Sequence, residues 1–130
     1  MQAVGEDMTM ELPAQPESVA EARHAAAELA RRVGADVADV KIAVSEAVGN
    51  AVIHAYRGRE RGIIRIVAAL ERNKLRFWIS DRGIGMSPNL DSPGLHLGLP
   101  LIGKVAHDLH IDAGSRGTTI SFSFPVEATA

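Results

Sequence analysis

Two runs of mostly apolar residues, separated by a short polar turn, constrain the fold of this chain more than any other feature. Residues 62–70 are rich in β-branched side chains, and residues 75–80 alternate apolar with polar. The polar segment 71–74 between them is short enough for a hairpin, which requires antiparallel pairing. The same alternation occurs at residues 8–12, 109–113 and 118–124. The sequence therefore predicts a mixed, mostly antiparallel sheet.

Three other segments have the helical period, in which apolar residues recur at spacings of three and four. Pro16 and Gly34 bound the first segment, Asp36 or Asp39 can cap the second, and Gly98 is expected to open the third. Pro100 is expected in the first turn of that third helix, where proline is tolerated. The resulting order, β α α β β loop α β β, predicts an α+β fold: a two-layer α/β sandwich with helices on one face.

The composition excludes several classes of protein. With 130 residues, 46% of them apolar, the chain can form one domain with a real core. A net charge of −2 argues against a nucleic-acid partner, and the chain has no cysteine for disulfides or thiolate metal sites. No apolar run approaches the roughly 20 residues that span a bilayer. We expect a cytoplasmic domain at 8–125, without a membrane partner, between a flexible N-terminus at 1–7 and a loose tail at 126–130.

A polar stripe lies on the second predicted helix. Glu46, Asn50 and His54 are spaced four apart, so they share one face of that helix. A carboxylate and a carboxamide one turn apart, beside Gly49, could hold a metal ion or a water. The alternative is a solvated helix face, and the stripe alone does not distinguish the two.

Three downstream motifs bear on that choice. Asp81 ends a predicted strand and is followed by Gly83 and Gly85, which would let a ligand approach the backbone. Gly98 would open a helix whose free N–H groups attract phosphate. Segment 117–119 is Gly-Thr-Thr and could place a threonine hydroxyl beside Asp81. Each motif alone also has an ordinary structural explanation: a capped turn, a helix cap or a hairpin turn.

The order and spacing of these motifs resemble those of the Bergerat-fold ATPases, which include gyrase, Hsp90, the histidine kinases and MutL. The helix stretch from Ser45 to Tyr56, S-E-A-V-G-N-A-V-I-H-A-Y, is similar to that of the anti-sigma factor serine kinases within this superfamily. The resemblance covers residues 8–124. It implies an ATP-binding regulator that binds a sigma factor and phosphorylates a serine or threonine on an anti-anti-sigma (STAS-type) protein, commonly as a homodimer.

The resemblance also implies roles for individual residues. Asn50 would ligate Mg²⁺ between the phosphates of ATP, and Glu46 would be the general base that takes the proton of the acceptor hydroxyl. His54 ends the same stripe and would either touch phosphate or pack or cap the helix, and packing or capping is the general expectation for a lone histidine. Asp81 would recognise adenine, with Thr119 supporting its carboxylate. The remaining positions would let base and ribose lie close or would hold the phosphates with backbone amides: Gly83, Gly85, Gly98 and Leu99.

Two features of this sequence differ from the family pattern. His96 stands where relatives have the first glycine of a G-x-G motif, and residues 86–97 contain no Lys or Arg, although relatives place a basic residue in this loop. These differences favour an alternative function, a partner-binding module without kinase activity, whether or not it uses nucleotide. The ATPase half of a two-component histidine kinase ranks lower, because 130 residues leave little room for a dimerising helix pair.

Overall fold

The computed structural model describes residues 7–55, 62–82, 93–114 and 117–127, without the side chains of 54–55 and 93–98. The expected flexible N-terminus lies outside these residues except for Asp7, and the expected tail does so from residue 128. The elements in chain order are β1 Met8–Pro13, α1 Glu17–Val33, α2 Val37–Ala55, β2 Ile63–Glu71, β3 Lys74–Asp81, α3 Pro93–Val105, β4 His107–Gly114 and β5 Gly117–Pro125.

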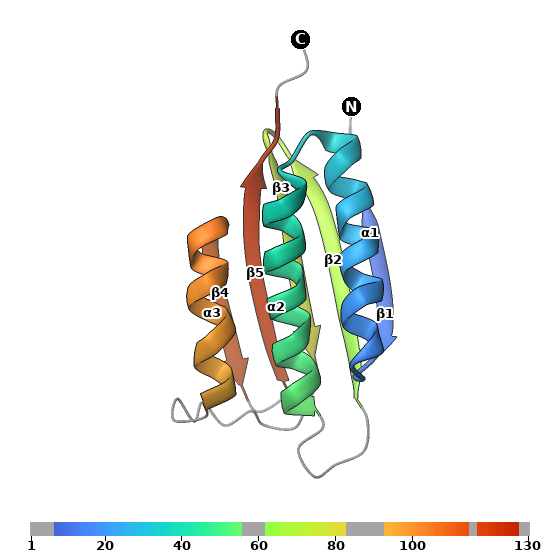
Figure 1. Cartoon of the computed structure of the whole chain (residues 1–130), viewed down its shortest axis with the longest axis vertical. Helices are drawn as coiled ribbons and strands as arrows, with labels where there is room; N and C mark the ends of the chain where they lie inside the picture. Colours follow the sequence, from blue (N-terminus) through green and yellow to red (C-terminus); the bar gives the residue numbers. More distant parts are fainter. Residues whose placement is uncertain (1–6, 56–61, 83–92, 115–116, 128–130) are drawn as a thin grey trace.

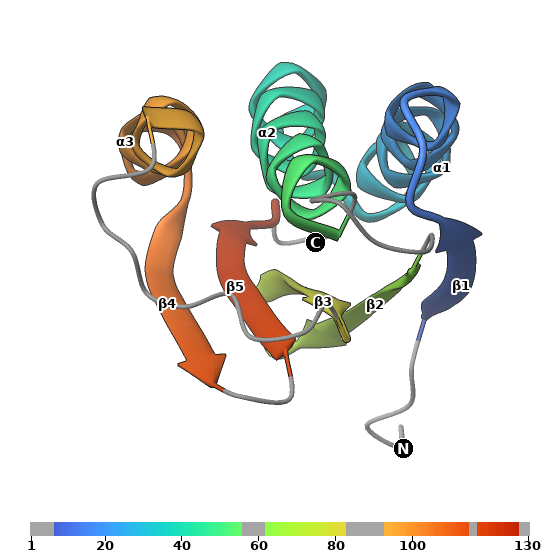
Figure 2. The ribbon, with the colours of Figure 1, turned by 90° about the horizontal axis from the view of Figure 1, so that it is seen from below.

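These elements form two layers, with α1, α2 and α3 side by side on one face of the sheet (Figures 1 and 2). The described strands make a five-stranded sheet in the order β1-β2-β3-β5-β4. Every pairing between described strands is antiparallel. The predicted α+β sandwich is confirmed, and the sheet, expected to be mixed, is antiparallel within the described chain. Strand β5 lies between β3 and β4, which puts β3 at the centre.

Local signals in the sequence set the boundaries of the first two helices. Gly34 ends α1 in the left-handed conformation, with φ 85°, and its N–H donates to the carbonyl of Ala30. The Asp36 side chain accepts a hydrogen bond of 3.0 Å from the Asp39 N–H, so Asp36 is the residue that caps α2. The hairpin between β2 and β3 is also confirmed, with Glu71 opposite Lys74.

The start of α3 differs from the prediction. Residues 86–97 were expected to form a loop, yet the helix begins at Pro93. A proline suits the first helical position because its missing N–H would have no intrahelical partner there. Pro100 consequently lies inside the helix rather than in its first turn, and it costs α3 one backbone hydrogen bond.

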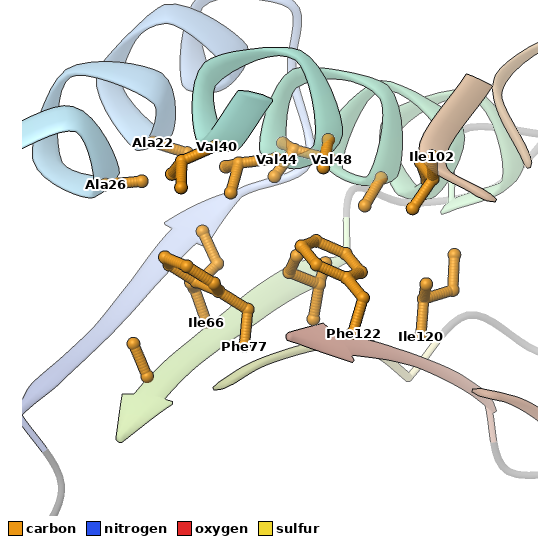
Figure 3. Packing of buried hydrophobic residues seen from close by; sticks show 14 of the residues in the cluster. Ala22, Ala26, Val40, Val44, Val48, Ile66, Phe77, Ile102, Ile120 and Phe122 are labelled. Carbon is orange, nitrogen blue, oxygen red and sulfur yellow. The ribbon is translucent and has the colours of Figure 1, made fainter. Parts of the chain in front are cut away.

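The core lies between the sheet and the helices (Figure 3). All three phenylalanines of the chain, Phe77, Phe122 and Phe124, pack together there, with ring centroids 5.7–6.0 Å apart. The helices cover them with small side chains, including Ala22 and Ala26 of α1, which let α1 and α2 lie close to each other. None of the described helices combines the length and apolarity needed to cross a bilayer.

Asp108 connects β4 to the strands beside it at an irregularity in the register between β4 and β5. It adopts the left-handed backbone conformation, with φ 53°. Its carboxylate accepts hydrogen bonds from Lys74 Nζ at 3.0 Å and Ser123 Oγ at 3.2 Å. The hydrogen bond from Lys74, followed by that from Ser123 and the charge of Lys74, holds the pKa of Asp108 below its ordinary value.

Candidate active site

Helix α2 separates a core face from a functional face. Apolar side chains on its sheet side, among them Val44 and Val48, are fully buried. On another face Glu46 is half-buried, and Asn50, one turn later, is 6% exposed. At Asn50, therefore, this face of α2 is not solvated: the carboxamide is inside the protein. The His54 side chain lies outside the described part.

The buried carboxamide of Asn50 has an unsatisfied atom. Its Nδ2 has no hydrogen-bond partner among the described residues, and such a buried atom costs about 1–3 kcal/mol. Gly49 beside it has no described atom within 4 Å of where a Cβ would stand, so the flank is open. A polar ligand at this position would relieve the cost of the unpaired atom.

This arrangement fits a magnesium ion held together with a phosphate group. No cluster of three or more His, Cys, Asp or Glu side chains suited to a metal occurs in the described ranges. Mg²⁺ does not need such a cage, because it commonly takes one or two protein oxygens, several waters and oxygens of a phosphorylated substrate. A half-turn of the Asn50 carboxamide would present its oxygen at the position of Nδ2.

The fold brings the other predicted segments to the end of α2 that carries Asn50. Helix α2 and strand β3 both end at the lower side of the molecule in Figure 1, where α3 and β5 both begin. Asp81 is the last residue of the central strand and is 7% exposed. It shares the helix-covered face of β3 with Ile79 and Phe77 because side chains alternate along a strand. A buried carboxylate can accept hydrogen bonds from a ligand amine.

The threonine next to Asp81 is Thr118, so the prediction of Thr119 as its support is wrong. Thr118 is paired directly with Asp81 in the register of β3 and β5 and is 3% exposed. Thr119 pairs with Ser80, and their hydroxyls are 3.0 Å apart on the other face of the sheet. The sequence did contain the signal: Thr118 has the same parity as the buried residues Ile120, Phe122 and Phe124.

Gly117 makes the close pairing of Asp81 and Thr118 sterically feasible. Its φ is 132°, and a Cβ there would overlap the carbonyl oxygen of Asp81 and lie 3.0 Å from the Cα of Arg82. Any other residue would push β5 away from the end of β3. The glycine of the Gly-Thr-Thr motif therefore serves a close approach of two backbones.

The structure corrects the expectation for Gly98 and Leu99. They lie in the second turn of α3, because the helix begins five residues before Gly98. Free N–H groups belong to the first turn of a helix, so these two residues do not supply them. Gly83 and Gly85 lie outside the described residues, and so does the side chain of His96.

A polar contact that the motifs did not indicate lies between α1 and α2. Arg23 Nη1 donates to Ser45 Oγ at 3.5 Å, which places a guanidinium beside the residue that precedes Glu46. No local pattern could reveal this contact, since the two residues are 22 positions apart and meet only when the helices pack.

Comparison with known proteins gives one consistent result. Residues 12–124 match the family model described as histidine kinase-like ATPase domain. The chain is 36% identical over 124 residues to the serine-protein kinase RsbW of Bacillus thuringiensis, covering 82% of this chain and 77% of that protein. It is 38% identical over 86 residues to RsbW of Listeria monocytogenes and 39% over 82 residues to the anti-sigma F factor of Clostridium beijerinckii.

Those two alignments cover 64% and 61% of this chain and 55% and 57% of the respective relatives. The chain thus spans little more than half the length of several curated relatives that it matches. A crystal structure of the RsbU and RsbW domains of a Mycobacterium tuberculosis protein superposes with a TM-score of 0.71 at 26% identity, covering 95% of this chain and 34% of that one. The chain belongs to the histidine kinase-like ATPase domain family.

Proposed function

We propose that this protein is an ATP-binding anti-sigma regulator that phosphorylates a serine or threonine on an anti-anti-sigma partner. The observation that carries the proposal is the pair on α2: a half-buried Glu46 one turn before a buried Asn50 whose Nδ2 has no hydrogen-bond partner in the described part of the chain. A module that only bound nucleotide would use the carboxamide and would not need a carboxylate beside it. The names of the relatives, serine-protein kinase and anti-sigma F factor, support the same function.

The proposed roles of Asn50, Glu46, Asp81 and Thr118 are supported by their burial and their places on α2, β3 and β5, and those of Gly83 and Gly85 by the resemblance in sequence. Asn50 would hold Mg²⁺, which when bound neutralises phosphate charge. The carboxylate of Asp81 would accept a hydrogen bond from the adenine amine, and Thr118 would help to orient it. Glu46 would take the proton of the acceptor hydroxyl as that oxygen bonds to the γ-phosphorus and the bond from this phosphorus to ADP breaks. Gly83 and Gly85 would let the base and ribose lie close.

The partners are part of the proposal. The acceptor is a STAS-type anti-anti-sigma protein, and the protein held in its absence is a sigma factor. Both partner proteins would bind a homodimer of this chain in the cytoplasm, where transcription takes place. The domain that binds ATP and these partners would span residues 8–125.

The test is transfer of labelled phosphate from Mg-ATP to STAS-type proteins of the same organism. Glu46→Gln keeps the shape of the side chain and removes the base, so transfer should fall by about 10²–10⁴-fold while ATP affinity changes little. Glu21→Gln makes the same change on the exposed side of α1 and should leave transfer unchanged. Micromolar ATP binding without transfer to any such protein would refute the kinase.

ATP binding without phosphate transfer would favour the alternative function, a partner-binding module. The observation behind this alternative is the absence of Lys and Arg from residues 86–97, since a basic residue stabilises the charge that develops in phosphoryl transfer. Calorimetry with Mg-ATP distinguishes the two functions further. A dissociation constant far above the micromolar range would indicate a protein that binds its partners without nucleotide.

A further inference from the structure

A groove follows the outer side of α2. This helix lies between α1 and α3 in both views of the molecule (Figures 1 and 2). Its volume is about 420 Å³. Helix α2 supplies most of its walls, while one residue each from α1 and α3 completes the rim. The lining residues are Arg23, Ala38, Lys41, Ile42, Ser45, Glu46 and Leu101. We call this feature the Glu46 groove.

The Glu46 groove adjoins the proposed chemistry. Glu46 is both a lining residue of the groove and the proposed base, one turn from Asn50. A hydroxyl must come within hydrogen-bond distance of a base to lose its proton to it. The core-facing side of α2 is closed by the sheet, so the groove is an approach to Glu46 from outside.

The charges of the groove favour an acidic segment. Among the described lining residues, Arg23 and Lys41 are cations and Glu46 is the single acid, so these residues together carry one net positive charge. Neither cation has an ion-pair partner within the described chain. Arg23 gives one of its five donors to Ser45 in a long contact of 3.5 Å, which leaves its other donors for a bound segment.

The groove also has an apolar part. Ile42 and Leu101 are 37% and 38% exposed, although most large apolar side chains of the described chain are buried. They lie on α2 and α3 and can receive an aliphatic side chain of a bound segment. The two features together describe an occupant with carboxylates and an aliphatic residue close to a hydroxyl.

We propose that the Glu46 groove binds the serine-bearing segment of the protein substrate, and that Arg23 and Lys41 select a segment with acidic residues next to that serine. This inference rests on the proposed kinase function and deepens it. Arg23 and Lys41 are specificity-determining residues in this proposal, because they touch the substrate away from the reacting atoms. Two exposed ion pairs correspond to a gain in affinity of roughly two- to thirty-fold.

The probe is a pair of nine-residue peptides with a central serine and a leucine two residues from it. One peptide has aspartates on both sides of the serine, and the other has asparagines there. Titration of the isotope-labelled protein, followed by amide NMR shifts without nucleotide, should shift Arg23 and residues 38–46. The acidic peptide should bind at least about threefold more tightly, and its advantage should shrink at high salt.

Charge reversal distinguishes this groove from a general electrostatic effect. Arg23→Glu combined with Lys41→Glu should abolish the preference for the acidic peptide. Arg32→Glu makes the same change at an exposed position near the end of α1 and should preserve it. Equal binding of the two peptides, shifts confined to other elements, or an unchanged preference in the double variant would overturn the proposal.

The experiments distinguish a failure of the Glu46 groove to bind acidic segments from an absence of kinase activity. Peptide selectivity is measured without ATP, and ATP affinity and phosphate transfer are measured separately. With an active acceptor protein, the double variant should raise the KM for that protein and leave the KM for ATP unchanged. Selective peptide binding without any phosphate transfer would support peptide binding in the groove and contradict the kinase function. Normal KM values in the double variant would contradict the role of the groove in binding the substrate.

Discussion

Replacing Asn50 with leucine should make the protein more stable and unable to bind nucleotide. The side chain is 6% exposed, and its Nδ2 has no partner among the described residues. Leucine branches at Cγ as asparagine does and has no polar atom, although its side chain is larger. The substitution therefore removes an unsatisfied buried group and, in the same step, the proposed ligand of Mg²⁺.

The magnitude follows from the cost of that group. An unpaired buried donor destabilises the folded state by about 1–3 kcal/mol, and part of the gain is lost to imperfect packing of the larger side chain. We expect the free energy of unfolding to rise by about 1 kcal/mol. For a chain of 130 residues this corresponds to an increase in Tm of roughly 4 °C.

The assay is urea unfolding with and without Mg-ATP at about one hundred times its dissociation constant. Nucleotide that binds only the folded state should stabilise the wild type by about 2.7 kcal/mol. The Asn50→Leu variant should show none of this stabilisation. Asn73→Leu, the same change at an exposed turn position, serves as the control and should respond to nucleotide like the wild type.

Two results would contradict the proposed role of Asn50. If Asn50→Leu lowers the free energy of unfolding by more than about 1 kcal/mol without nucleotide, the carboxamide makes stabilising contacts in the folded protein. If nucleotide stabilises the variant as much as the wild type, Asn50 takes no part in binding it. A gain in stability together with a loss of the nucleotide response is the signature of a residue kept for function.

Substitutions at Thr118 and Asp108 test, respectively, the part of the site on the sheet and the contacts that connect β4 to its neighbouring strands. Thr118→Ala should weaken ATP binding about fivefold in calorimetry, the equivalent of one hydrogen bond. Thr119→Ala, on the other face of the sheet, should leave ATP binding unchanged. A larger loss for Thr119→Ala than for Thr118→Ala would restore the role predicted for Thr119. Asp108→Asn preserves a residue that tolerates positive φ and removes the charge, so it should lower Tm at pH 7. Because the folded pKa of Asp108 is depressed, its contribution exists above the unfolded value of about 4. The wild type should therefore lose its advantage as the pH falls through the lower folded pKa, and a difference in Tm that stays constant down to pH 2 would contradict the ion pair.

Strand β5 buries the residues that its sequence pattern places inward. Alternation predicted a strand with Ile120, Phe122 and Phe124 inward, and the structure buries all three. The same alternation puts Thr118 on the inner face and Thr119 on the outer one. Thr119 was predicted from the Gly-Thr-Thr motif alone. Alternation along the strand, which is readable in the sequence, puts Thr118 rather than Thr119 on the same face as Asp81.

The error over α3 has a different cause. A loop was predicted for 86–97 because it contains two prolines and a glycine. The helix nevertheless begins at Pro93 and passes through Pro100. Local propensity opposed that helix, but burial of Ile102 against the core, with Leu99 partly buried beside it, is a tertiary contribution that propensity does not include.

The elements that depend on neighbouring residues follow from the sequence alone: the hairpin of β2 and β3, the caps at Gly34 and Asp36, and the spacing of Glu46 and Asn50 on one helix. They do so because turns, caps and periodicity act within a few residues. Three contacts arise only in the folded chain: β5 against β3, Thr118 opposite Asp81, and Arg23 against Ser45 in the Glu46 groove. These contacts join residues 22 or more positions apart, and they form only when the helices pack on the sheet and its strands pair in one register.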